Sequence, residues 1–169
     1  DAALATERFT LALVLEPEDA GARDGLRRAG SLEEVERLLS ETEDLRDANR
    51  LDEALATAQR AVALDGAHEQ ARSVVSSIRT QIADNAFTRV MSEGFSALQA
   101  GESESAIAAF ERALAMRPNS TQAQEAITQT KDQLAVTQIN LHRSAAERYE
   151  LQEQWAAAVR EYDQALSID

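Results

Sequence analysis

Apolar residues recur with helical spacing in four stretches of the chain. In each stretch an alanine, a central residue that is aromatic in three copies, and a second alanine fall at positions i, i+4 and i+7, on one face of a helix. The stretches carry Ala5, Phe9 and Ala12; Ala54, Ala58 and Ala61; Ala106, Phe110 and Ala113; and Ala158, Tyr162 and Ala165. The spacing predicts amphipathic helices over residues 2–15, 51–64, 102–116 and 153–167.

The four stretches recur at a nearly constant interval. Their last alanines stand at positions 12, 61, 113 and 165, so the steps are 49, 52 and 52 residues. A fixed period of a few tens of residues is typical of stacked repeat units. Four unrelated alanine-rich helices would not share this interval. We therefore expect one domain over residues 1–169, with repeat units at about 1–17, 18–66, 67–118 and 119–169.

The segments between these stretches are also predicted to be helical. Apolar residues keep helical spacing from Ala71 to Gly94 and from Ala123 to Tyr149, and neither segment contains proline. The pattern predicts two long helices, over about 68–100 and 120–151. A cap at residue 84 or 85 would instead divide the first of them.

The segment from residue 18 to residue 48 is expected to hold two helices. Gly30 is expected to end the first. Ser31, followed three residues later by Glu34, has the pattern of a capping box and is expected to begin the second.

At these residues the chain resembles the tetratricopeptide repeat (TPR) family, whose unit is a pair of antiparallel helices. The best copy consists of Val90, Gly94, Gly101, Ala106, Phe110, Ala113 and Pro118. The resemblance implies an all-α solenoid of antiparallel helix pairs. A TPR repeats every 34 residues, and the longer period here implies elongated first helices. Because the chain opens and closes inside a repeat, we expect it to be a fragment of a longer protein.

The composition narrows the classes of partner. The chain carries 30 acidic and 17 basic residues, a net charge of −13, and Lys131 is its one lysine. This charge disfavours nucleic acids and anionic membranes and favours a basic or amphipathic protein or peptide. No apolar run is long enough to insert into a membrane. The absence of cysteine fits the cytoplasm and the periplasm equally, and the alanine- and arginine-rich composition suggests a bacterial source.

The sequence contains no pattern typical of an enzyme, a cofactor site or a metal site. His68 and His142 are the two histidines and lie far apart, and His142 is expected to be packed or to lie at the rim of the helix face. Glu41 and Glu93 recur at the 52-residue period, where ion pairing or exposure at the rim is expected rather than acid–base chemistry. No glycine-rich phosphate loop, nucleophile elbow or zinc spacing is present. We expect no catalytic residues, no cofactor and no metal.

The TPR resemblance implies that the first helices line a concave groove that binds partner peptides. The expected partner-binding residues are Leu39, Ser40, Glu43, Met91, Ser92, Phe95, Arg143, Ser144 and Glu147. Met91 and Phe95 would form an exposed apolar anchor between acidic flanks. The alternative is that the register is shifted by one and that Phe95 packs inward. The basic clamp by which some TPR domains hold C-terminal carboxylates is not matched here.

Two other functions remain open at the level of sequence. The first is self-assembly through the extended helices, whose stripe consists of Val74, Val75, Ile78 and Ile82. In a solenoid this stripe would be covered by Ile127, Leu134, Ala22 and Leu26 of adjacent extensions, or by a second copy if they leave it open. The second is that of a recruiting arm in a longer enzyme or envelope protein.

Overall fold

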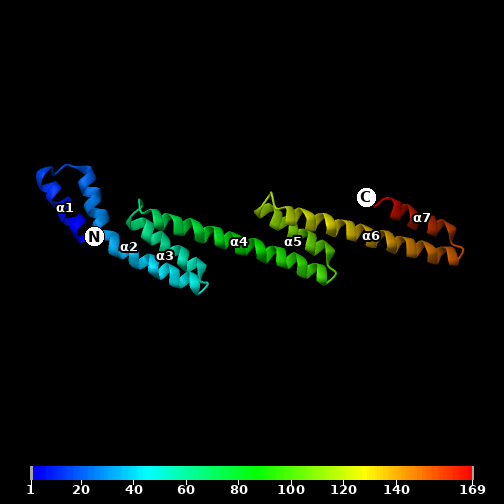
Figure 1. Cartoon of the computed structure of the whole chain (residues 1–169). Helices are drawn as coiled ribbons and strands as arrows, with labels where there is room; N and C mark the ends of the chain where they lie inside the picture. Colours follow the sequence, from blue (N-terminus) through cyan, green and yellow to red (C-terminus); the bar gives the residue numbers. More distant parts are fainter. Residues whose placement is uncertain (1, 169) are drawn as a thin grey trace. The chain divides into compact units, whose positions relative to one another are not determined.

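The computed structural model describes residues 2–168, which form seven α-helices and no β-strand (Figure 1). In chain order they are α1 (Ala2–Leu15), α2 (Ala20–Asp47), α3 (Leu51–Leu64), α4 (Glu69–Gln99), α5 (Ser103–Met116), α6 (Thr121–Leu151) and α7 (Trp155–Leu166). The all-α class is therefore confirmed. The four short helices begin and end within two residues of the predicted bounds.

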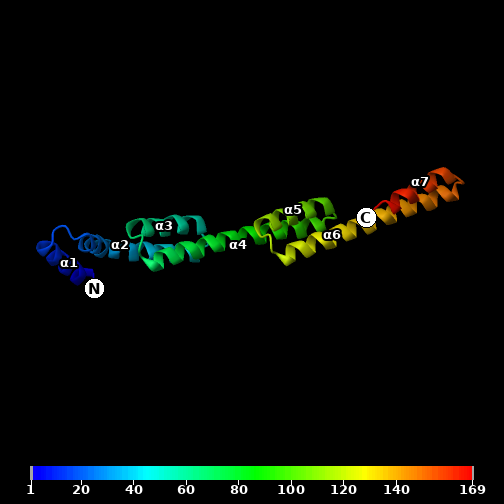
Figure 2. The ribbon, with the colours of Figure 1, turned by 90° about the horizontal axis from the view of Figure 1, so that it is seen from above.

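The chain divides into two compact units, one ending at Asp84 and the other beginning at Asn85. Both residues lie within α4, so this helix contributes its first half to the first unit and its second half to the second. Within each unit a short helix folds back along a long one: α3 along α2, and α7 along the C-terminal half of α6 (Figures 1 and 2). The four repeat units expected from the sequence stay a prediction.

The core of the first unit lies between α2, α3 and the first half of α4. Val35, Leu38 and Leu39 of α2 pack there with Ala61 of α3 and Ala71 of α4. A second cluster places Ile78 of α4 against α3.

The contact of α1 with α2 in the same unit depends on a glycine. A β-carbon at Gly25 would lie 2.4 Å from the ring of Phe9. Only a residue without a side chain lets this ring approach α2 so closely.

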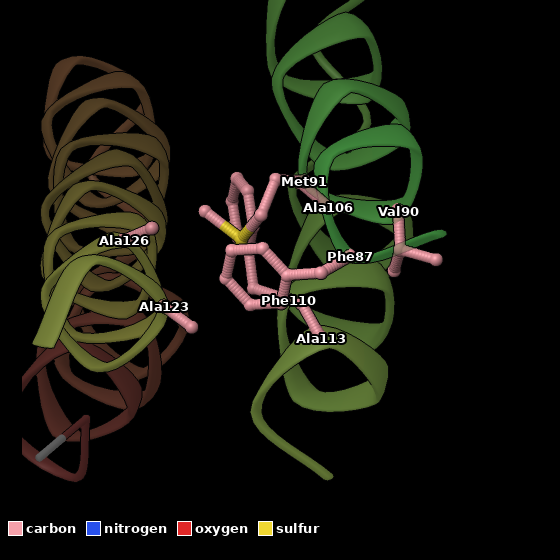
Figure 3. Packing of buried hydrophobic residues seen from close by; sticks show 8 residues of the cluster. All are labelled: Phe87, Val90, Met91, Ala106, Phe110, Ala113, Ala123 and Ala126. Atoms are coloured by element: carbon pink, nitrogen blue, oxygen red, sulfur yellow. The ribbon is translucent and has the colours of Figure 1, made fainter. Parts of the chain in front are cut away.

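The core of the second unit surrounds Phe110 of α5 (Figure 3). Phe87, Val90 and Met91 of α4 surround this ring with Ala106 and Ala113 of α5 and Ala123 and Ala126 of α6. The two alanines of α6 face the aromatic rings, and their small side chains let the helix come close (Figure 3). A β-carbon at Gly94 would lie 2.4 Å from the ring of Phe110, so the glycine makes room for it.

The same turn closes each of the three helical hairpins, and it recurs every 52 residues. Asn49, Gly101 and Glu153 have the positive φ values of 56°, 79° and 56°. The next residue in each case donates its N–H to a carbonyl five residues earlier: Arg50 to Leu45, Glu102 to Ala97 and Gln154 to Tyr149, at 2.8, 2.9 and 2.9 Å. This is the hydrogen bond of a Schellman motif. The backbone thus repeats with the period of the sequence.

The start of each long helix is also built alike, through a side-chain cap. Asp19, His68 and Ser120 each accept a hydrogen bond from the amide three residues later, at 3.1, 3.2 and 3.2 Å. A side-chain acceptor at this position satisfies an amide that has no partner within the helix. His68 is therefore a capping residue, with Nδ1 as the acceptor.

Two expectations about the long helices are decided by the structure. The predicted long helices correspond to α4 and α6, and both are continuous, so the break considered at Asp84 is absent. The break expected at Gly30 is wrong, because α2 runs through it. The Ser31 hydroxyl donates to the Arg28 carbonyl within the helix (3.1 Å) and does not cap a new one. A glycine inside a helix costs only about 1 kcal/mol, and α2 is packed both before Gly30, where Gly25 meets Phe9, and after it, where Val35 lies in the core.

The cover expected for the stripe on α4 is also wrong. Val74, Val75 and Ile82 pack around Ile78 against the hairpin of the same unit. The covering residues are Leu45 of α2 and Leu51, Ala54, Leu55 and Ala58 of α3. Ile127 packs instead against the Phe110 cluster. The short helix that precedes α4 therefore supplies most of the cover of this stripe.

Candidate interaction surfaces

The nine residues expected to bind a partner divide into exposed and buried positions. Ser40, Glu43, Ser92, Arg143, Ser144 and Glu147 are exposed on α2, α4 and α6, and Phe95 is partly exposed. Leu39 and Met91 are buried, with 5% and 3% of their surface exposed, and both belong to the helix cores. The expectation that Met91 is exposed is therefore wrong. Met91 follows Phe87 by four residues, which places both on the inner face of α4.

Phe95 is the aromatic residue of the expected groove, and 42% of its surface is exposed. One side of its ring meets Phe110 edge to face, with the ring centroids 5.1 Å apart and the planes at 64°. The residues 52 positions before and after it are Glu43 and Glu147. The repeat therefore does not require an aromatic ring at this position, and its outer side is available for contact.

The polar residues around the expected groove are largely occupied within their own helices. The Ser92 hydroxyl donates to the Thr88 carbonyl at 2.9 Å. Arg143 and Glu147 form an ion pair at 3.6 Å. Such exposed pairs contribute little to stability, so they can exchange for contacts with a partner at low cost.

The two residues proposed for ion pairing are paired as expected. Glu41 accepts from Arg37 at 3.1 Å, and Glu93 accepts from Arg112 of α5 at 3.0 Å. His142 Nδ1 lies 2.8 Å from a carboxylate oxygen of Glu161, which links α6 to α7. Within residues 2–168, no three histidine, cysteine, aspartate or glutamate side chains are grouped so that they could hold a metal ion.

One buried carboxylate fixes the loop between α3 and α4. Asp65 accepts from Nε of Arg28 at 2.9 and 3.0 Å and from the amide of Ala67 at 3.0 Å. Burial acts to raise the pKa of Asp65, but these hydrogen bonds and the charge of Arg28 outweigh it, so the pKa lies below its usual value. The pair is a structural tie between α2 and this loop.

A surface that the sequence reasoning missed lies on α7. Trp155, Val159, Tyr162 and Leu166 follow one another at i, i+4, i+7 and i+11 and form one face of the helix, here called the α7 stripe. The exposed fractions of Trp155, Val159 and Leu166 are 63%, 57% and 84%, and Tyr162 is half-buried. The signal available in the sequence was the repeat itself, because these residues stand 52 positions after Ser103, Ile107, Phe110 and Leu114.

A second surface missed from the sequence is a groove between α3 and α4. Its volume is about 360 Å³, and it is lined by Gln59, Val62, Arg72, Val75, Ser76 and Arg79. At the same register of the second unit, Glu111 of α5 and Lys131 of α6 form an ion pair at 3.6 Å. The groove of the first unit thus carries Gln59 and Arg79 where the second unit has this ion pair.

No family model matched the chain in a scan, and a search of curated proteins found no match either. Over residues 2–168, no helix combines the length and the apolar character needed to cross a membrane.

Proposed function

We propose that the chain is a non-enzymatic protein-interaction scaffold, built from TPR-like hairpins in a solenoid, that binds a peptide or helix of another protein. The proposal is supported by the recurrence of one hairpin design. The turns at Asn49, Gly101 and Glu153 and the caps at Asp19, His68 and Ser120 repeat with the sequence period. Repeat arrays of this kind commonly present extended binding surfaces.

The single observation that carries the proposal is the exposed ring of Phe95. One side of the ring packs against Phe110, which restricts its orientation before a partner binds. Rigid aromatic side chains in polar surroundings dominate the binding energy of many interfaces. The net charge of −13 favours a basic or amphipathic partner segment. The buried Met91 and Leu39 take no part in this surface.

Replacing Phe95 by glutamate tests the proposal, because glutamate is the residue that the repeat places at this register in the other two hairpins. Affinity capture would compare the wild type, Phe95→Glu and the control Val136→Glu, which removes another exposed apolar side chain. We expect proteins held by the wild type and the control to be lost from Phe95→Glu. Circular dichroism checks that all three remain helical. Equal capture by all three proteins would contradict the proposal.

Self-association is a second candidate, favoured by exposed apolar residues on α1. Leu11, Val14 and Leu15 all have exposed side chains on this helix. Ile78 is not a suitable position for a test variant, because its side chain is fully buried and a charge there would unfold the first unit. Val14→Glu is the better variant. Sedimentation velocity that finds dimers in the wild type and monomers in Val14→Glu would support self-association, and a monomer at every concentration would exclude it.

A further inference from the structure

The groove between α3 and α4 combines an apolar surface with two arginines. All of its lining residues belong to the first unit. Val62 and Val75 are half-buried there, whereas Arg72 and Arg79 are exposed. The two arginines stand seven residues apart on α4, which places their Cα atoms about 10 Å apart along the helix axis at 1.5 Å per residue. The groove thus offers two cationic side chains with apolar surface between them.

Neither arginine of the groove has a carboxylate within the chain. Over residues 2–168, the side chains of Arg72 and Arg79 form no ion pair and no hydrogen bond. This is unusual in the chain, because most of its other basic side chains on α2, α4 and α5 lie in ion pairs with aspartate or glutamate. The two guanidinium groups therefore keep their hydrogen-bond donors free for a ligand.

The second unit shows what is missing at this register. There Glu111 and Lys131 form an ion pair at 3.6 Å, and the neutral Gln124 donates to the Pro118 carbonyl at 3.2 Å. The corresponding residues of the first unit are Gln59, Arg79 and Arg72. The three positions carry no net charge in the second unit and a charge of +2 in the first. The carboxylate that the second unit supplies from its own short helix is absent from the first.

We propose that this groove binds an acidic peptide segment of another protein, whose carboxylates contact Arg72 and Arg79 and whose apolar side chain packs on Val62 and Val75. Carboxylates are the partners that the planar guanidinium group holds best, through paired hydrogen bonds. This site goes beyond the contact proposed for Phe95, because it lies in the other unit and selects the opposite charge. One ligand carboxylate takes the place that Glu111 occupies in the second unit.

The dimensions of the groove define the peptide. An extended chain rises about 3.3 Å per residue and turns alternate side chains to the same face. Two acidic residues four positions apart, with an apolar residue midway, thus present three side chains on one face over about 13 Å. Long arginine side chains bridge the difference from their own spacing. The groove volume of about 360 Å³ suits such a short segment.

Neither a terminal extension nor a second copy of the chain fits the groove as well. In repeat arrays a helix packs on its neighbours in sequence, and the neighbours of α3 and α4 are α2 and α5. The groove is therefore an internal feature of the array and not an end of it. A second copy carries a charge of −13 and is repelled by the first. A short acidic segment brings the carboxylates with much less repulsion.

A titration of the full chain, labelled with ¹⁵N and followed by NMR, tests the proposal. The probe is the blocked peptide Glu-Ser-Leu-Ser-Glu. We expect the backbone amides of Val75 and Ser76 and the Nε resonances of Arg72 and Arg79 to shift with saturation. The matched control peptide Gln-Ser-Leu-Ser-Gln has the same shape without the charges and should cause no such shift.

Variants of the protein make the test specific. Gln59→Glu gives the first unit the carboxylate of the second, which should pair with Arg79 and weaken peptide binding about fivefold. Arg79→Glu should weaken it about tenfold, and a peptide with lysine in place of one glutamate should recover the affinity. The control Arg160→Gln removes an exposed arginine of α7 outside the groove and should bind normally. These changes affect exposed side chains, and the remaining resonances report whether the fold is kept.

The site is separable from the surface proposed around Phe95. Phe95→Glu should bind the acidic peptide with unchanged affinity, because its side chain does not line the groove. Gln59→Glu should in turn leave the capture of partners by the Phe95 surface unchanged. Failure of one proposal is therefore distinguishable from failure of the other.

Four results would overturn the proposal. The first is that the groove resonances stay unchanged up to millimolar peptide. The second is that the glutamine peptide shifts them equally. The third is that inorganic phosphate at the same concentration shifts them equally, which would mean a simple anion site. The fourth is that they shift with protein concentration in the absence of peptide, which would mean that a second copy fills the groove.

Discussion

In the hairpin of α4 and α5, Phe110 is fully buried, whereas Tyr162, at the same register in the hairpin of α6 and α7, is half-buried. The two hairpins share the same turn and the same spacing of alanines. They differ in the neighbour, because α6 packs on α5. The comparison shows that burial in this chain is decided by the next helix and not by the hairpin alone, as expected for repeat structures.

The inner faces of these two hairpins also differ. Val90 and Ala109 are buried apolar residues in the hairpin of α4 and α5. At the same register, the hairpin of α6 and α7 carries the hydrogen-bonded His142 and Glu161. Glycine at position 94 lies against Phe110, whereas the corresponding position holds Ala146, opposite the register of Tyr162. The first hairpin is thus built for tight apolar packing and the second for a partly polar contact.

The largest difference between the hairpins should come from removing the central ring. Phe110→Ala should lower the free energy of unfolding of the second unit by about 3–5 kcal/mol, because it leaves a cavity in the core. Tyr162→Ala should have a smaller effect, since its ring is half-buried. Urea denaturation followed by circular dichroism measures both. Equal losses of unfolding free energy in the two variants would mean that α5 and α7 are equally covered, which would contradict the difference between the hairpins.

The close contact of Gly94 with Phe110 gives the next largest effect. Gly94→Ala should destabilise the protein by about 1–3 kcal/mol, because the new β-carbon meets a ring that has no room to move. In the background of Phe110→Ala the same change should cost little, since the clash is gone. A double-mutant cycle measures this coupling. Additive costs would show that the glycine is needed for another reason.

The turns give the smallest expected effect. Glu153 has a positive φ of 56°, where the hairpin of α4 and α5 has Gly101. Glycine accepts this conformation without steric cost. Glu153→Gly should therefore raise stability by about 0.5–1 kcal/mol, and Gly101→Glu should lower it by a similar amount. Thermal unfolding of both variants measures the two effects. A loss of stability in Glu153→Gly, or a gain in Gly101→Glu, would contradict the Schellman assignment.

The ends of the short helices could be predicted because local signals define them. Pro17, Gly66 and Pro118 follow α1, α3 and α5 closely, and the apolar spacing gives the face. The continuity of α2 could not be predicted, since the pattern of Ser31 and Glu34 is locally compatible with a cap. The helix continues through Gly30 because the residues before it and after it are both packed, Gly25 against Phe9 and Val35 in the core.

The candidate surfaces were less predictable than the helices. Met91 was expected to be exposed, but its place on the inner face of α4 depends on which neighbours cover that helix. The α7 stripe was missed because its residues look like core residues in sequence. Their exposure follows only from the arrangement of the neighbouring helices, which no local pattern records.

The exposure of Trp155 in the chain alone tests the central claim most directly. The claim is that α5 and α7 carry the same stripe and that only the one on α7 is open. Acrylamide quenching of the single tryptophan, at two protein concentrations, measures its accessibility. The account predicts emission typical of a solvent-exposed indole, efficient quenching, and no dependence on concentration. A shielded tryptophan with blue-shifted emission in the chain alone would contradict it.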